Sequence, residues 1–348
     1  MACGDFHFSA SVIIMKDIFF YTLRAILPIL LIVFLGYITR HAGAWPDDFY
    51  KTLNQLCFRL FLPIHLFYNV YSVENLAAMN WKVLCYLFFS VFLCLALGLI
   101  TRRLCVHDRG QKGAVIQASF RSNQAILGLP LANALGGEEA MAFASLGTSV
   151  CVPVFNVLAV VVLAIYSGEE KGKISAASLV RRVITNPLII GCVSGVFMVI
   201  VRQLLPVASG VPVFTIRNQL PSVYQAIENL SRVASPVMLF VLGTRLNFSS
   251  VSGLLPQLRL GLLLRLVICP AVVLGLALIL RKQLGLTTLE MPTLIAVSST
   301  PVAVSSAVMV QEMGGDDQLA GQLVVWSSVF SVISMFCVVS LMRFCGLL

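Results

Sequence analysis

Two short polar runs interrupt apolar segments of the chain, and both contain groups that bind anions. The first run holds a guanidinium, a hydroxyl and two amides, and the second holds two hydroxyls followed by a proline. The residues are Arg121, Ser122, Asn123 and Gln124 in the first run and Ser299, Thr300 and Pro301 in the second. Guanidinium, amide and hydroxyl donors match the acceptor oxygens of a carboxylate. Both runs are therefore predicted to be substrate-binding residues for a small organic anion.

Prolines beside both runs should expose the helix backbone. Pro130 removes the hydrogen bond to the carbonyl of Ile126, and Pro301 removes the one to Val297. Together with Gly128, these prolines are the predicted hinge or break positions. Freed backbone groups survive at membrane depth only where they face protein or a watery cavity. Two half-helix ends are therefore expected to meet near the midplane, where their positive dipoles favour an anionic group.

Each candidate residue also has a plainer interpretation. Arg121 lies eight positions into its apolar segment, so at about 1.5 Å per residue it is about 12 Å deep. It either pairs with a substrate carboxylate or reaches cytoplasmic water or freed carbonyls. Asn123 and Gln124 either line a site or form hydrogen bonds between helices. Ser299 and Thr300 either line the site or pack as small hydroxyl residues.

The composition is that of a membrane protein. The chain has 348 residues, of which 59% are hydrophobic and 11% charged, whereas a soluble domain carries about 25% charged residues. The excess of Lys and Arg is scattered through loops, so topology explains it better than nucleic-acid binding. The cysteines have no metal-ligand spacing, so no metal or other cofactor is expected. The lack of HExxH, GxSxG and Gly-rich nucleotide motifs argues against an enzyme or an ATP-driven pump.

The predicted fold class is an all-α membrane protein with ten transmembrane helices. A bilayer core of about 30 Å needs about 20 apolar residues, and windows of that length cover nearly the whole chain. They are residues 18–39, 49–70, 81–100, 113–135, 140–166, 184–204, 224–246, 260–280, 291–311 and 319–344. Lys and Arg concentrate in the loops after odd-numbered windows, so these loops are predicted to be cytoplasmic and both termini to lie outside.

The chain contains two copies of one unit. The string from Arg59 to Pro63 returns from Arg232 to Pro236, an offset of 173 residues (232 minus 59). A Gly-Gly-acid-acid string at 136–139 returns at 314–317, an offset of 178 (314 minus 136). Each copy holds five windows, and five is odd. Residues 1–170 and 171–348 are therefore predicted to form two inverted five-helix repeats.

The repeated strings and the other ionisable residues have predicted structural roles. The glycines should cap the broken helices in the left-handed conformation, and the acids should stabilise the start of the next helix. Arg59 and Arg232 are expected to be buried and to have a structural role in kinked scaffold helices, because each carries the backbone carbonyl that the proline four residues later leaves unbonded. Glu228 and His65 either carry a coupling proton or hold an interface together, and the structural role is preferred.

Several motifs along nearly the whole chain match one family pattern. They are NQAILGLPL at 123–131 followed by LGGEE at 135–139, NPLII at 186–190, PVMLFVLG at 236–243, and Pro301 with Gly-Gly at 314–315. These motifs resemble the auxin efflux carrier family, which includes bacterial malate and malonate permeases. The resemblance implies a scaffold domain from helices 1, 2, 6 and 7 and a transport domain from helices 3–5 and 8–10. It also implies that the broken helices four and nine cross at the substrate site, and that the transport domain moves like an elevator.

The resemblance implies a secondary active transporter of small organic anions, such as malate or malonate, in the cytoplasmic membrane. Coupling to H⁺ or Na⁺ and a homodimer through the scaffold domain are expected by the same analogy. The chain lacks the long central loop of plant members and has Ser-Ser-Thr before Pro301, so auxin itself is not implied. Two alternatives stay open, namely a bile-acid or arsenite type of carrier with the same plan and a non-transporting membrane ligand sensor.

Overall fold

The computed structural model describes residues 24, 26–72, 80–105, 108–166, 176–205, 207–208, 211–212, 214–247, 251–287 and 290–348. Within these residues the chain is almost entirely helical, and its only strands are β1 Val207–Ala208 and β2 Val211–Pro212, which pair antiparallel. Apart from Arg24, the part of the first predicted window before residue 26 lies outside the described residues.

The helices follow one another with short connections. The first half contains the helix Ile26–His41, α2 Asp47–Leu56, the π-helical turn η1 Cys57–Phe61, α3 Leu62–Tyr71, α4 Trp81–Cys105, α5 Arg109–Phe120, the π-helical turn η2 Gln124–Gly128 and α6 Leu129–Tyr166. The second half contains α7 Ala176–Ile184, α8 Pro187–Leu204, α9 Ile216–Gln219, α10 Pro221–Arg245, α11 Val251–Leu263, the π-helical turn η4 Leu264–Ile268, α12 Cys269–Ile279, α13 Arg281–Leu284, α14 Met291–Ser299, α15 Ser305–Glu312 and α16 Asp317–Phe344.

Six segments of the described chain are each long and apolar enough to cross a membrane. They are Trp81–Thr101, Gln124–Tyr166, Pro187–Leu204, Pro221–Arg245, Val251–Ile279 and Asp317–Phe344. Large apolar side chains lie on their outer faces, such as Phe197 with 61% and Ile279 with 76% of its surface exposed. Such faces suit lipid rather than water. The chain is therefore a multi-pass helical membrane protein, and although helix overlaps every predicted window, the number of ten crossings stays a prediction.

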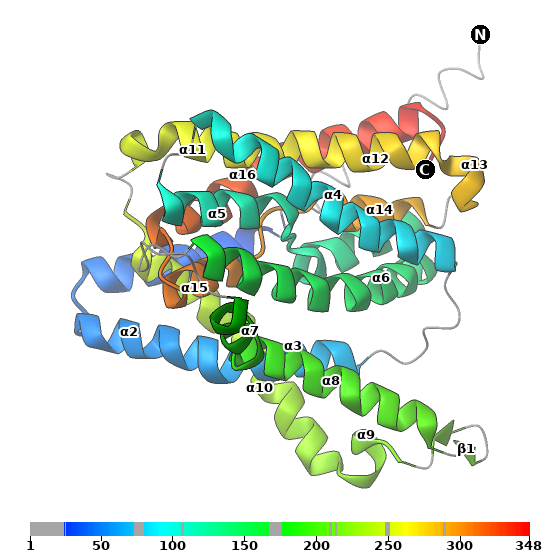
Figure 1. Cartoon of the computed structure of the whole chain (residues 1–348), viewed down its shortest axis with the longest axis horizontal. Coiled ribbons are helices and arrows are strands. Elements are labelled where there is room, and N and C mark those ends of the chain that lie inside the picture. The colour runs from blue at the N-terminus through cyan, green and yellow to red at the C-terminus, as the bar shows by residue number, and fades with distance from the viewer. Residues whose placement is uncertain are drawn as a thin grey trace.

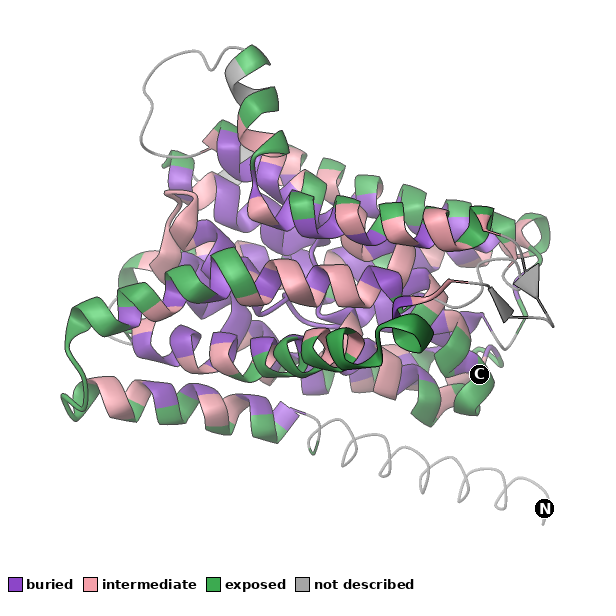
Figure 2. Cartoon of the chain, turned by 90° about the horizontal axis from the view of Figure 1, so that it is seen from below, coloured by how far each residue is buried: buried purple, intermediate pink, exposed green. Residues whose placement is uncertain are grey.

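The helices gather into two groups. In Figure 1, α2, α3, α8, α9 and α10 lie along the lower side, and α4, α5, α6, α11, α12, α14 and α16 form the larger body above. Glycines allow close packing in the lower group. A Cβ on Gly191 of α8 would collide with the backbone of Pro63, and one on Gly36 would collide with the carbonyl of Phe240 in α10. Figure 2 shows the buried residues where helices face each other and the exposed ones on the outer faces.

The Gly-Gly-acid-acid strings end one helix and begin the next. Gly137 has φ 71° and Gly314 has φ 72°, the left-handed conformation that favours glycine. A glycine with positive φ thus occurs in both copies, at the second glycine of the first string and the first glycine of the second, but Gly137 has ψ −166° and does not form the predicted left-handed helix cap. Asp316 caps α16, because its carboxylate accepts a hydrogen bond of 2.9 Å from the Leu319 N–H. The run α6 is consequently two helices that meet at a kink at Gly136 and Gly137.

Candidate functional site at the crossing of two broken helices

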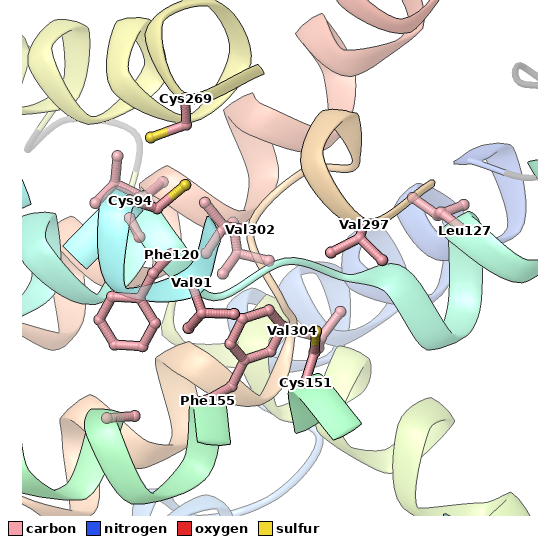
Figure 3. Packing of buried hydrophobic residues seen from close by; sticks show 14 of the residues in the cluster. Val91, Cys94, Phe120, Leu127, Cys151, Phe155, Cys269, Val297, Val302 and Val304 are labelled. Atoms are coloured by element: carbon pink, nitrogen blue, oxygen red, sulfur yellow. The ribbon is translucent and has the colours of Figure 1, made fainter. Parts of the chain in front are cut away.

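The two predicted breaks lie against each other. Helix α5 ends at Phe120 and the chain becomes helical again at Gln124, while α14 ends at Ser299 and α15 begins at Ser305. Between these ends the two extended pieces pair antiparallel, with Ser122 opposite Val302. Figure 3 shows Phe120, Val302 and Val304 beside these extended pieces.

Two backbone hydrogen bonds close this crossing. The Asn123 N–H donates to the Pro301 carbonyl at 2.8 Å, and the Ala303 N–H donates to the Arg121 carbonyl at 3.1 Å. The two bonds are equivalent, because each segment donates one backbone N–H to the other segment and accepts one hydrogen bond from it. Each break therefore satisfies backbone groups of the other, which is the condition for irregular backbone at membrane depth.

The two breaks have different local causes. Pro301 cannot donate a backbone hydrogen bond and pushes the residue before it out of the helical region, and Thr300 accordingly has φ −73° and ψ 153°. The first break lies upstream of Pro130, which occupies the first turn of α6. Gly128 and Pro130 are helical, and the turn η2 before Pro130 widens to a π-helix instead of breaking. A Cβ on Gly128 would come 2.8 Å from the Ala296 carbonyl oxygen, so glycine permits η2 to approach α14.

Arg265 holds both helix ends at the crossing, and sequence reasoning missed it. This side chain in η4 is only 1% exposed and donates only to backbone carbonyls. Its bonds reach Thr300 at 2.8 Å, Ser298 at 2.9 Å, Ser119 at 3.2 Å and Val297 at 3.3 Å. A cation at the carboxyl end of a helix binds orphan carbonyls and offsets the negative dipole end. The Val297 carbonyl is the one that Pro301 leaves unbonded.

A signal for Arg265 was present in the sequence. It stands in the apolar run LLRLVICP at 263–270, and a cation within a membrane-spanning segment indicates a functional or structural partner. The same argument that selected Arg121 applies to it. Its ligands are carbonyls of distant helices, however, and no sequence pattern marks those.

Arg121 is buried among neutral groups. Its side chain is 3% exposed and donates to Asn156 Oδ1 at 2.8 Å and to Ser305 Oγ at 2.9 Å, with the Met309 sulfur also in contact. No carboxylate among the described residues forms an ion pair with it. Asn156 is held in place because its amide donates to the Val152 carbonyl at 2.8 Å. The positive charge of Arg121 is therefore buried without a counter-ion.

Polar atoms next to Arg121 lack partners. Ser122 Oγ, Asn123 Nδ2, and Gln124 Nε2 and Oε1 are all buried and make no hydrogen bond within the described chain. The three side chains are 1–5% exposed. A buried polar group without a partner costs about 1–3 kcal/mol. Three consecutive residues with this property indicate a place where a ligand or water supplies the missing bonds.

A cavity of about 60 Å³ lies beside these residues. It is lined on one side by Arg121, Ser122, Asn123, Gln124 and Ser305 and on the other by His65 and Asn69 of α3 and Ser235 of α10. The cavity therefore separates the crossing from the lower group of helices. Its volume holds water but is well below the 300–1,000 Å³ of typical ligand pockets. In this conformation the site is nearly closed.

The second predicted run does not line this cavity. Ser299 and Thr300 are fully buried, but the Thr300 hydroxyl donates to the Ala296 carbonyl at 3.1 Å. The Ser299 hydroxyl has the Ser298 hydroxyl at 3.5 Å. Pro301 contributes its carbonyl to the crossing. The structure thus brings the first run and Ser305 to the cavity and places Ser299, Thr300 and Pro301 behind it.

The expectation that Arg59 and Arg232 are buried is wrong, because both side chains lie on the exposed surface. Arg232 forms an ion pair of 2.6 Å with Glu228, one helical turn away, and its own side chain is 73% exposed. Glu228 also accepts a hydrogen bond of 3.1 Å from the Tyr68 hydroxyl. An arginine on a lipid-facing surface extends its long side chain toward polar groups at the interface. Glu228 thus connects α10 to α3, as the structural interpretation predicted.

His65 has partners on two helices. Its Nδ1 lies 3.0 Å from the Ser231 hydroxyl and 3.1 Å from the Ser231 carbonyl, and its Nε2 lies 3.1 Å from the Asn69 amide nitrogen. A ring that donates to the carbonyl and accepts from the amide is neutral, with its proton on Nδ1. His65 therefore joins α3 to α10 at the wall of the cavity.

Apolar helices around a polar crossing of broken helices form the architecture of a membrane transporter. A family model described as membrane transport protein matches residues 21–339. The chain therefore belongs to this family, the auxin efflux carrier family that its motifs resemble. Membership of a transporter family supports the prediction that the chain is not an enzyme.

Two archaeal relatives match nearly the whole chain. An uncharacterized transporter of Methanocaldococcus jannaschii is 24% identical over 320 residues, which cover 88% of this chain and 94% of the relative. An uncharacterized transporter of Methanothermobacter thermautotrophicus is 22% identical over 328 residues, covering 91% of this chain and 97% of the relative. The similarity thus extends over both halves and includes the crossing.

Proposed function

We propose that this protein is a secondary active transporter that moves small organic anions, such as malate or malonate, across the cytoplasmic membrane. The observation that carries the proposal is the buried Arg121, which has only neutral partners and stands beside three unpartnered polar side chains at a cavity. A carboxylate would supply the missing negative charge. It would also accept hydrogen bonds from the guanidinium and from the Asn123 amide, and bonds to charged groups are the stronger ones.

The ligand would bind between a fixed and a moving group of helices. The cavity lies between the crossing and the α3 and α10 side chains. We assign helix Ile26–His41, α2, α3, α8 and α10 to the scaffold domain and the other long helices to the transport domain. Because the present cavity is smaller than a dicarboxylate needs, the transport domain would slide along α3 and α10 to admit the ligand.

Internal symmetry supports ten spans in two inverted repeats. An offset of 180 residues relates the two hydrogen bonds of the crossing, because it matches residue 121 with 301 and residue 123 with 303. Each bond then becomes the other when the two copies are interchanged. A second pair of contacts also occurs once in each copy. A Cβ on Gly36 would meet the Phe240 carbonyl, and a Cβ on Gly195 would meet the Phe67 carbonyl. Phe67 and Phe240 occupy equivalent positions of the two copies. Residues 1–170 and 171–348 would then be the repeats, with both termini outside and a homodimer formed through the scaffold.

Uptake by proteoliposomes tests this function. Radiolabelled malate, malonate, lactate and indole-3-acetate are supplied with an imposed pH gradient, an imposed sodium gradient, or neither. We expect gradient-dependent uptake of at least one of the small carboxylates, and the effective gradient identifies H⁺ or Na⁺ as the coupling ion. Absence of gradient-dependent flux for every carboxylate would exclude the proposed function. Binding without flux would favour a ligand sensor.

A further inference from the structure

An apolar groove on the outer surface is separate from the crossing. It has a volume of about 560 Å³ and runs between η4 and α12 on one side and α16 on the other. Leu266, Leu274 and Leu278 line the first side, and Ile333, Val338 and Met342 line the second. Its volume lies in the range of about 300–1,000 Å³ that is typical of ligand pockets.

The groove faces the bilayer. Val267, Ile333 and Leu341, which line it, each expose 53–59% of their surface. The Ser334 hydroxyl, a polar group at the groove, is bonded to the Leu266 carbonyl. Apart from the Cys337 thiol, which is only a weak hydrogen-bonding group, the described lining therefore offers an occupant no free polar side chain. The lining suits a hydrocarbon chain, which enters from the surrounding membrane.

The groove has the depth of one leaflet. Gly261 packs against Leu323, and Ser334 bonds to Leu266, so α11–α12 and α16 run parallel. From Leu266 to Leu278 the groove extends for about 18 Å at about 1.5 Å per residue. Half of a hydrocarbon core of about 30 Å is about 15 Å. Because the predicted span ends at residue 280, the Leu278 end of the groove is expected at the level of the lipid headgroups.

Three cations lie at that end. Arg281 and Lys282 begin α13 just after Leu278, and Arg343 follows Met342 in α16. None of the three forms an ion pair with another described residue, and Arg343 Nε is buried without a hydrogen-bond partner. Figure 1 shows the C-terminal end of the chain beside α13. The positive charge at the mouth of an apolar groove complements an anionic headgroup.

We propose that this groove binds one anionic phospholipid, with an acyl chain along α12 and α16 and the phosphate at Arg281, Lys282 and Arg343. A second copy of the chain fits less well. A two-fold partner on this face would bring its own three cations to the same membrane depth, where like charges repel. The proposal does not depend on which solute the protein transports.

Native mass spectrometry of the purified protein in mild detergent tests the proposal. Phosphatidylglycerol and phosphatidylcholine with identical acyl chains are titrated separately. We expect the first phosphatidylglycerol to bind the wild type about tenfold more tightly than phosphatidylcholine. Gly275 lies in the groove, and a Cβ there meets no atom within 4 Å. Gly275→Leu should therefore fill the groove and weaken binding of both lipids about tenfold.

A matched control and a charge variant separate the contribution of the apolar groove from that of the cations at its end. Gly253 of α11 is equally open and lies outside the groove, so Gly253→Leu should bind both lipids like the wild type. Ala271→Phe blocks the groove at a second position if Gly275→Leu does not fold. Arg281→Ala combined with Arg343→Ala should remove the preference for phosphatidylglycerol and weaken phosphatidylcholine binding much less, because the choline group already neutralises the phosphate of that lipid.

Three results would overturn the proposal. The first is wild-type lipid binding by both groove-filling variants. The second is an undiminished phosphatidylglycerol preference in the double arginine variant. The third is a wild-type dimer that Gly275→Leu dissociates while the bound lipid remains, which would assign the groove to a second copy of the chain.

Discussion

Two arginines lie buried at the same helix crossing, and their partners separate their roles. Arg265 donates to four backbone carbonyls and has the surroundings of a structural clamp. Arg121 donates to an amide, a hydroxyl and a sulfur, all neutral side-chain groups, and lines the cavity. A buried charge with only neutral partners is costly, and membrane proteins keep such charges where function needs them. Arg121 is thus the residue on which anion binding should depend.

Substitution of Arg121 should weaken anion binding without unfolding the protein. Arg121→Gln keeps hydrogen-bonding capacity but removes the charge, and bonds to charged groups contribute about 1.5–3 kcal/mol. The dissociation constant of the transported carboxylate, measured by calorimetry in detergent, should rise about 10- to 150-fold. Arg259→Gln, an exposed arginine of α11, is the control and should bind normally. Equal affinity of both variants for the carboxylate would show that Arg121 does not contribute to binding.

Substitution of Arg265 should lower stability instead. Arg265→Met leaves the carbonyls of Val297, Ser298 and Thr300 without this donor. The expected cost is about 3 kcal/mol or more, because unsatisfied buried groups cost about 1–3 kcal/mol each. The thermal unfolding midpoint in detergent should fall well below that of Arg121→Met. Equal unfolding midpoints for the two variants would contradict the structural role of Arg265.

At the scale of elements, polar contacts join the two groups of helices on one side of the crossing. Asn54 of α2 donates to Glu312 at the end of α15, and the Gln318 amide of α16 donates to the Arg245 carbonyl at 3.1 Å. Asn54 is fully buried. An elevator movement of α15 and α16 along α2 and α10 must break both contacts. These two contacts therefore provide a direct test of whether the two groups of helices move past each other.

Cross-linking Asn54 to Glu312 should stop transport. Both residues are changed to cysteine in a chain whose ten native cysteines are replaced, and a short bifunctional thiol reagent joins them. Flux in proteoliposomes should fall to background, because α2 and α15 can no longer slide. A cysteine pair at Tyr68 and Glu228, which links α3 to α10 within the scaffold, should leave flux intact. Wild-type flux through the Asn54–Glu312 cross-linked protein would refute an elevator.

At the scale of the whole molecule, the proposed ten crossings put both termini on the same side of the membrane, and the distribution of Lys and Arg predicts that this is the outer side. Cys345 is exposed near the C-terminus, and Lys51 is exposed on α2 at the start of the second predicted span, on its predicted cytoplasmic side. In a chain with Cys345 as its single cysteine, a membrane-impermeant maleimide should label intact cells. In a chain with only Lys51→Cys, labelling should require permeabilised cells. The opposite pattern would invert the orientation, and labelling of both in intact cells would refute the span count.

Much of this architecture could be predicted because it depends on local chemistry. Hydropathy alone marks the membrane segments, and Pro301 marks the second break. The first break was harder to place. It lies at Arg121 to Asn123, and Pro130 coincides only with a π-helical turn, because a proline in the first turn of a helix causes no break.

The sequence by itself determined that the chain is a helical membrane protein of this transporter family, with glycines of positive φ and two interrupted helices. These properties follow from apolar runs, prolines and glycines, whose effects act within a few residues. Only the tertiary structure decided that Arg121 has neutral partners, that Arg265 binds four carbonyls, and that Arg59 and Arg232 are exposed. Those outcomes depend on side chains and carbonyls that come from helices up to 188 residues apart, and no local pattern encodes such contacts.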